Sequence, residues 1–264
     1  MAFHLAAWTC RMLRERDYFR ETKAPDLARL LALVAVGTVA DMVPLTGSNR
    51  LLVHAGLKRL ERRQYAGLRV LIDRVHEQQR EKEEKKRKKQ QNRWGGSNAP
   101  LPAPPITERT IGFDIAPRLN AAGRLADADL AWRLLVTDDE AEAQQLFEEL
   151  DALNKKRRAT QKETVDAVMR KVKAASHLPD FIVAYDADWH PGVVGLAAGR
   201  LADLYHRPAA VIGQGGKGSA RAPEGLNLVA VLAEGLVEEG LERGDRGELR
   251  DGRLVRYGGD VGEI

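Results

Sequence analysis

The sequence has almost no cysteine and no long apolar run. Cys10 is the one cysteine among 264 residues, which excludes an intramolecular disulfide framework and a zinc site built from cysteines. No window approaches the roughly 18 apolar residues of a membrane-spanning helix, and the N-terminus lacks the basic, apolar and small-residue order of a signal peptide. We therefore expect a cytoplasmic protein that has no membrane partner.

Most of the chain also lacks an excess of positive or negative charge. Lys and Arg number 42 against 38 Asp and Glu, a net charge of +4. Residues 76–93 (HEQQREKEEKKRKKQQNR) carry eight of the bases and four of the acids, so this segment accounts for the whole excess. We interpret it as a solvated, partly helical or disordered segment rather than a dedicated nucleic-acid tail.

The composition changes sharply after this basic segment. Gly, Ser and Pro crowd residues 95–105, where a helix cannot persist. We therefore predict three parts: a first domain over residues 1–75, a linker or insertion over residues 76–107, and a second domain over residues 108–264.

The pattern of apolar residues predicts an α/β fold. We expect a helix over residues 3–20, a strand that ends at Asp41, and one long helix or two helices broken near Gly67. The chain after residue 108 should turn into a helix near Arg124 and continue in a long amphipathic helix. From residue 180 the order is strand, helix, strand, strand, helix, which is typical of a domain with a mixed sheet.

Asp41 stands out because it ends the run VAVGTVAD, which is otherwise small or β-branched. In a buried strand and turn, a carboxylate costs several kcal/mol unless a metal, a strong donor or a base pairs with it. No complete metal motif accompanies it, since the six histidines are scattered along the chain. A single carboxylate cannot usefully hold Mg²⁺ or Mn²⁺ by itself.

A second group of polar residues surrounds the turn YDADWHPGVVG and the segment GGKGSARA. His190 precedes a Pro-Gly helix start, whose free N–H groups suit a phosphate, and Gly192 lets a ligand come close. Beyond Gly218, residues Ser219 and Arg221 are two apart, so on a strand they face the same side. A hydroxyl and a guanidinium placed together predict a phosphate-binding site.

The segment PRLNAAGRL places Arg118, Asn120 and Arg124 among small residues. Two arginines and an amide can bind an anion. They can equally hold a joint between domains through hydrogen bonds to backbone carbonyls, and the spacing alone leaves both alternatives open.

Together these motifs resemble the RecJ family of single-stranded-DNA exonucleases, within the DHH phosphoesterase superfamily. ALVAVGTVADMVPL is similar to a motif of the DHH domain, and IGFDIAPRLNAAGRL to the motif that follows it. NRLLVHAGLKRL is similar to the start of the family's interdomain helix. DWHPGVVGLAAGRLADLYHRPAAVI and KGSARA resemble the DHH-associated domain.

The resemblance implies a partial DHH domain, a helical linker and a DHH-associated α/β domain. It implies 5′-to-3′ hydrolysis of single-stranded DNA in repair and recombination, with Mn²⁺ or Mg²⁺ as the cofactor. Asp41 falls on a metal ligand, Ser219 and Arg221 on the residues that hold the 5′ phosphate, and His190 on the loop facing the cleft. The partners implied are single-stranded DNA with a 5′ phosphate, a single-strand-binding protein and a helicase.

The sequence departs from the family pattern at both ends. The Asp-rich and Asp-His-His motifs, which supply most metal ligands, do not precede Asp41, and GGD stands where the family has Gly-Gly-His. We therefore expect a chain truncated at both ends that binds its substrate but lacks full hydrolytic activity.

Two other functions fit parts of this pattern. One is a phosphodiesterase of the same superfamily that acts on very short RNAs or other small phosphoesters. The other is a non-catalytic module that binds single strands. The oligomeric state and the identity of the metal are not specified by any of these motifs.

Overall fold

The computed structural model describes residues 1–94, 105–174, 177–231, 247–250 and 253–256. The chain folds into two compact units, Met1–Asn154 and Lys155–Ile264. This division differs from the domain boundary expected near residue 108, because the helices that follow residue 107 pack with the first unit. Among the helices that the structure describes, none combines the length and the apolarity needed to cross a bilayer.

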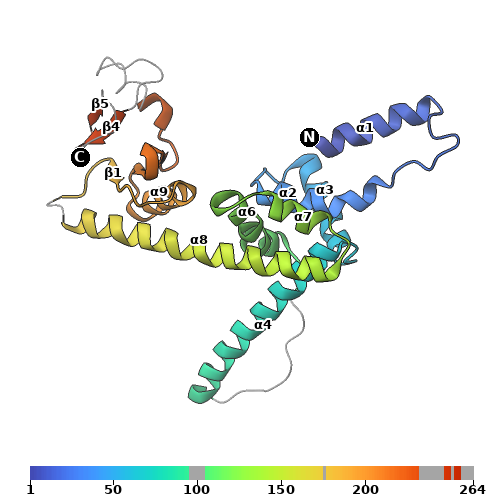
Figure 1. Ribbon diagram of the computed structural model, residues 1–264, viewed down its shortest axis with the longest axis horizontal. Helices are drawn as coiled ribbons and strands as arrows, with labels where there is room; N and C mark the ends of the chain where they lie inside the picture. Colours follow the sequence, from blue (N-terminus) through green and yellow to red (C-terminus); the bar gives the residue numbers. More distant parts are fainter. Residues whose placement is uncertain (95–104, 175–176, 232–246, 251–252, 257–264) are drawn as a thin grey trace. The chain divides into compact units, whose positions relative to one another are not determined.

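The first unit is built of helices (Figure 1). Its core includes Val36, Leu71, Ile115 and Leu150, each 3% exposed or less. The helical elements are α1 (Ala2–Glu15), η1 (Leu27–Leu30), α2 (Leu31–Ala40), α3 (Gly47–Leu60), α4 (Ala66–Trp94), α5 (Glu108–Thr110), η2 (Ile111–Ile115), α6 (Ala116–Leu125), α7 (Asp129–Val136) and the first part of α8 (Glu140–Ala174).

The strand predicted before Asp41 is wrong, because this segment forms α2. The buried residues Ala32, Ala35 and Val36 have helical spacing. A Cβ atom built on Gly56 of α3 would lie 2.2 Å from the carbonyl oxygen of Leu31, so the two helices are in close contact. Tertiary packing of small residues thus overrides the strand preference of the β-branched ones.

The segment near Gly67 forms two helices, α3 and α4, as one of the two alternatives predicted. The chain leaves the helix between Leu60 and Ala66. Gly67 itself lies inside α4, where a Cβ atom would lie 1.5 Å from the carbonyl oxygen of Leu134. This glycine therefore permits close packing of α4 against α7 rather than causing the break.

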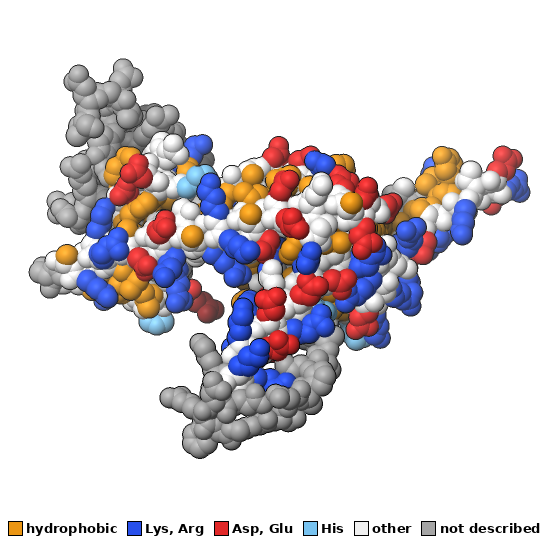
Figure 2. All heavy atoms as spheres, turned by 60° about the horizontal axis from the view of Figure 1, so that its bottom comes forward, with side chains coloured by type: hydrophobic (Ala, Val, Ile, Leu, Met, Phe, Trp, Pro, Cys, Tyr) orange, Lys and Arg blue, Asp and Glu red, His pale blue; other side chains and the backbone are white. Residues whose placement is uncertain are grey.

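The basic segment forms the outer part of α4, which extends away from the packed helices of the first unit in Figure 1. Residues 81–86 are all exposed, which agrees with the interpretation as a solvated and partly helical face. Figure 2 shows basic and acidic side chains intermixed over much of the visible face.

The helix expected to start near Arg124 instead ends there. The chain is helical from Glu108 through α5, the π-helical segment η2 and α6 to Leu125. A capping box between Thr107 and Thr110 starts this run. Pro117 lies directly after the π-helical segment, at the start of α6.

The second unit contains the predicted mixed sheet. Strands β1 (Ile182–Tyr185) and β2 (Ala209–Ile212) are parallel, and β3 (Gly218–Arg221) pairs antiparallel with β2. Helix α9 (Pro191–Tyr205) connects β1 to β2 and packs on the sheet through Val194, Ala198 and Leu201. The structure also describes η3 (Gln214–Gly216) and a two-stranded sheet of β4 (Gly247–Arg250) and β5 (Arg253–Arg256).

The long helix predicted before the sheet is confirmed as α8, which runs unbroken past the boundary between the units. The helix predicted after β3 is observed over residues 228–231, and the rest of the predicted segment lies outside the described residues.

Candidate nucleic-acid interface

The strand β3 places Ser219 and Arg221 on one side, as the alternation predicts. Ser219 is opposite Val211 and Arg221 is opposite Ala209 in the antiparallel pairing with β2. Nη1 of Arg221 donates a hydrogen bond to Oγ of Ser219 at 3.0 Å. Arg221 is exposed, so a guanidinium and a hydroxyl are presented together at the surface of the sheet.

Two glycines of α9 allow this pair to lie against the helix. A Cβ atom built on Gly195 would lie 3.0 Å from Oγ of Ser219, and one built on Gly199 would lie 3.8 Å from Cγ of Arg221. Neither glycine was among the residues predicted from the motifs. Their four-residue spacing, which puts two glycines on one face of a helix, is the signal that could have revealed them.

His190 lies at the N-terminus of the same helix. Its Nδ1 accepts a hydrogen bond from the backbone N–H of Gly192 at 3.0 Å, and its side chain is exposed. Pro191 occupies the first helical position, as predicted. His190 precedes Gly195 by five residues, which corresponds to about 7.5 Å along the axis of a helix.

The turn that carries His190 is fixed to the loop between β2 and β3. The backbone N–H of Gln214 donates to the carbonyl oxygen of Trp189 at 2.9 Å. A Cβ atom at Gly213 would lie 2.2 Å from that same oxygen, so only glycine fits there. Trp189 is 7% exposed, and Nζ of Lys171 lies 5.3 Å from the centre of its ring.

Five of the predicted residues lie in the second unit, where Ser219 contacts Arg221 and His190 contacts Gly192, while Gly218 adjoins Ser219 in β3. Helix α9 lies against the side of β3 that carries Ser219 and Arg221, and the turn with His190 leads into this helix. A hydroxyl, a guanidinium and a helix N-terminus are the groups that bind a phosphate in other proteins.

Asp41 belongs to the first unit, at the C-terminal end of α2. Its side chain is exposed, and its backbone N–H donates to the carbonyl oxygen of Gly37 at 3.1 Å. The buried setting expected from the sequence is wrong. The location remains unusual, because a carboxylate faces the negative end of a helix dipole there, and a cation would relieve that repulsion.

Asp41 does not form a metal centre with its described neighbours. Among the residues that the structure describes, no group of three or more His, Cys, Asp and Glu side chains is placed to hold a metal ion. Mg²⁺ and Mn²⁺ need several oxygen ligands. The described residues thus fit one ligand of such a site and not a whole one.

Arg118 is buried inside the first unit, and its guanidinium is held by protein acceptors. Nε donates to Asp151 at 2.8 Å, and both side chains are less than 10% exposed. The other two nitrogens donate to the carbonyl oxygen of Asp114 and to Oε1 of Gln78. Of the two alternatives predicted for this motif, anion binding and a structural joint, Arg118 fits the structural joint. The residues that it joins lie within one unit and not in two domains.

Asn120 and Arg124 differ from Arg118, because both lie on the exposed side of α6. The same predicted motif thus separates into one buried structural arginine and two surface residues.

Comparison with known proteins places these features in one family. No protein-family model matches the sequence. The single-stranded-DNA-specific exonuclease RecJ of Bacillus subtilis is 40% identical over 210 residues, covering 78% of this chain and 24% of that protein. RecJ of Escherichia coli is 32% identical over 98% of this chain and 41% of its own length.

Solved structures agree with the sequence comparison. RecJ from Thermus thermophilus in complex with Mn²⁺ superposes with a TM-score of 0.64 at 33% identity, covering 86% of this chain and 30% of the other. Its complex with Mg²⁺ gives a TM-score of 0.63. The chain belongs to the RecJ family. It spans between 24% and 41% of the length of these two curated RecJ relatives.

Proposed function

We propose that this chain acts in the removal of nucleotides from the 5′ end of single-stranded DNA, as a RecJ-type exonuclease. The observation that carries the proposal is the Ser219–Arg221 pair on β3, which lies against the glycine face of α9. This surface has the donors for a terminal phosphate, and family membership supplies the class of substrate.

Each residue of this surface has a distinct role in the proposal. The guanidinium of Arg221 and the hydroxyl of Ser219 donate to the 5′ phosphate, and Gly192 leaves room for it. Gly218, which was also predicted to bind the phosphate, faces the other side of β3, where a Cβ atom would lie 2.9 Å from Cγ1 of Ile212. In neutral His190, Nδ1 is the acceptor for Gly192, so the proton lies on Nε2. The proposal assigns the exchange of a proton with the substrate to that nitrogen.

Asp41 is proposed as one carboxylate ligand of Mn²⁺ or Mg²⁺, the ions named for the Thermus structures. A divalent ion in such an enzyme lowers the pKa of bound water and stabilises charge on the phosphate. Since the described residues supply no group of three ligands, we expect this chain by itself to bind single strands without efficient hydrolysis.

The phosphate site is tested by replacing Arg221 with alanine. We expect Arg221→Ala to weaken the binding of a 5′-phosphorylated oligonucleotide by about 1.5 to 3 kcal/mol, the size of a lost charge-assisted hydrogen bond. Binding of the same oligonucleotide with a 5′ hydroxyl should change much less. Fluorescence anisotropy at constant salt measures both affinities.

Arg200 offers a matched control, because it is an exposed arginine of α9 outside the Ser219–Arg221 pair. Arg200→Ala should lower both affinities slightly and equally. If Arg221→Ala weakens the binding of both oligonucleotides equally, Arg221 does not bind the 5′ phosphate.

A non-catalytic single-strand-binding module is the second candidate, favoured by the incomplete metal site. It predicts binding that persists without divalent ions and no product at any metal concentration. The comparisons do not favour a phosphodiesterase of short RNAs. A single-strand-binding protein and a helicase as partners, and a cytoplasmic location, remain predictions.

A further inference from the structure

Five residues of the helical run 108–125 follow one another along its solvent side. They are three or four positions apart, the spacing of residues on one helix face, and they cover about 22 Å of its length. The opposite side is buried in the core of the first unit, with Ile111 and Ile115 fully enclosed. The five residues, called the α6 stripe below, are Arg109, Phe113, Pro117, Asn120 and Arg124.

Phe113 is the unusual member of the α6 stripe. Its side chain is 62% exposed although it lies in the middle of a well-packed helical run. The guanidinium carbon of Arg109 lies 4.9 Å from the centre of its ring, a distance typical of a cation–π contact. The ring of Phe113 therefore contacts the positive charge of Arg109, while most of its surface is exposed to solvent.

The charges of the α6 stripe are complementary to a phosphate backbone. Arginines lie at both ends, and no acid belongs to it. Asp114, the acid nearest to Phe113 in sequence, is half-buried and accepts a hydrogen bond from Nε2 of Gln79 at 2.9 Å. An aromatic ring between basic side chains is the combination that binds single strands, whereas a partner helix would need a wider apolar groove.

The α6 stripe also passes close to the end of α2. A Cβ atom built on Gly112 would lie 3.7 Å from Cγ1 of Val39. Val39 precedes Asp41 by two residues, and Gly112 immediately precedes Phe113. The exposed ring and the exposed carboxylate thus belong to adjoining elements of the same unit.

We propose that the α6 stripe is a stacking platform for single-stranded DNA, on which a base lies against the ring of Phe113. Arg109 and Arg124 contact the phosphates on either side of that base, and the amide of Asn120 reaches its edge. The proposal rests on the proposed function, since it names a second contact surface for the same substrate.

The test compares two oligonucleotides that differ in their bases and not in their phosphates. One is a short oligothymidylate, and the other has the same length with abasic residues throughout. Phe113→Ala should weaken the binding of the oligothymidylate by about thirtyfold, the middle of the range for a lost base–aromatic contact. Its affinity for the abasic strand should stay within about twofold, and Phe113→Trp should retain the wild-type preference.

Trp132 supplies the matched control, because it is 59% exposed on α7 in the same unit but lies outside the α6 stripe. Trp132→Ala should leave both affinities unchanged. Equal effects of Phe113→Ala on the two strands, or no effect on either, would overturn the stacking platform while leaving the phosphate site intact. Failure of the wild-type chain to bind any single strand would overturn both proposals.

Discussion

His76 is a buried histidine in α4 that lacks a hydrogen-bond partner for one of its ring nitrogens. Its side chain is 4% exposed, and Nε2 has no partner among the described residues. Burial is the largest cause that lowers its pKa, and the nearby charges of Arg63 and Arg80 lower it further, while Asp114 opposes them. The folded chain therefore favours the neutral imidazole.

The lowered pKa of His76 predicts how the free energy of unfolding depends on pH. The unfolded chain takes up a proton near pH 6.5, whereas the folded chain does so at lower pH, so stability falls as the pH decreases through this interval. We expect His76→Leu to remove that part of the dependence. Urea unfolding followed by circular dichroism between about pH 8 and about pH 5 measures it.

His54 is the control for this change, since it is an exposed histidine of α3. His54→Leu should leave the pH dependence of the wild type in place. An identical slope for the wild type and His76→Leu would contradict the assignment.

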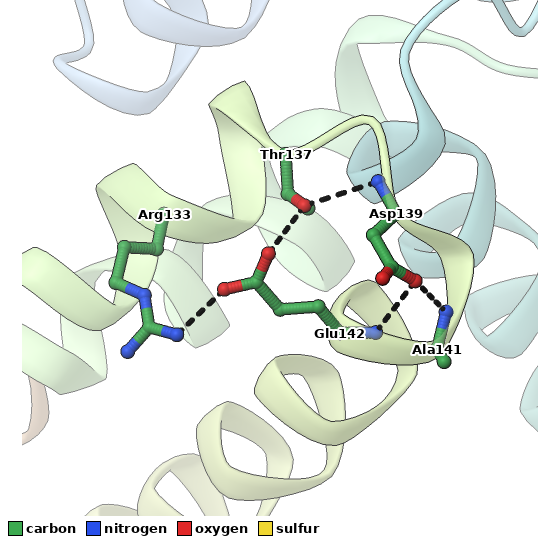
Figure 3. A network of polar contacts seen from close by, with 5 residues as sticks. All are labelled: Arg133, Thr137, Asp139, Ala141 and Glu142. Atoms are coloured by element: carbon green, nitrogen blue, oxygen red, sulfur yellow. Dashed lines mark hydrogen bonds and ion pairs between the residues drawn. The ribbon is translucent and has the colours of Figure 1, made fainter.

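At the scale of elements, the turn between α7 and α8 shows how side chains start a helix (Figure 3). Oδ1 of Asp139 accepts hydrogen bonds from the backbone N–H groups of Ala141 at 2.7 Å and Glu142 at 3.2 Å. The carboxylate of Glu142 in turn accepts from Thr137 and Arg133, each at 2.6 Å. These two bonds lower the pKa of Glu142, the one from Thr137 most strongly.

Asp139 is therefore the N-cap on which the start of α8 depends. Asp139→Ala should destabilise the chain by about 1 kcal/mol, because two backbone N–H groups lose their acceptor. The adjacent exposed Asp138 is the matched control, and Asp138→Ala should change stability by less than about 0.5 kcal/mol. Thermal unfolding of the three proteins at neutral pH measures the difference, and equal melting temperatures would contradict the assignment.

At the scale of the whole molecule, the excess of positive charge lies in one segment, and acids and bases balance over the rest of the chain. The net charge of +4 arises from residues 76–93, and acidic and basic side chains are intermixed in Figure 2. Affinity for a single strand should therefore depend on a few placed arginines rather than on a broad basic face.

The dependence of binding on salt tests this view. Each phosphate contact on a single strand contributes about 0.7 to the slope of the logarithm of affinity against the logarithm of salt concentration. Arg221→Ala should reduce the slope by about that amount, whereas replacing Lys85 and Lys86 on exposed α4 with Gln should leave it unchanged. A large decrease for the α4 variant would identify the basic segment as the main DNA contact.

The sequence by itself determined the family, the mixed sheet and the pairing of Ser219 with Arg221. These follow from local rules, because alternation on a strand and a Pro-Gly helix start depend on neighbouring residues alone. Tertiary structure decided that the segment before Asp41 is a helix, that Arg118 is buried against Asp151 and that Phe113 is exposed. Each of these depends on which distant helix covers the residue, and that is a property of packing rather than of local sequence.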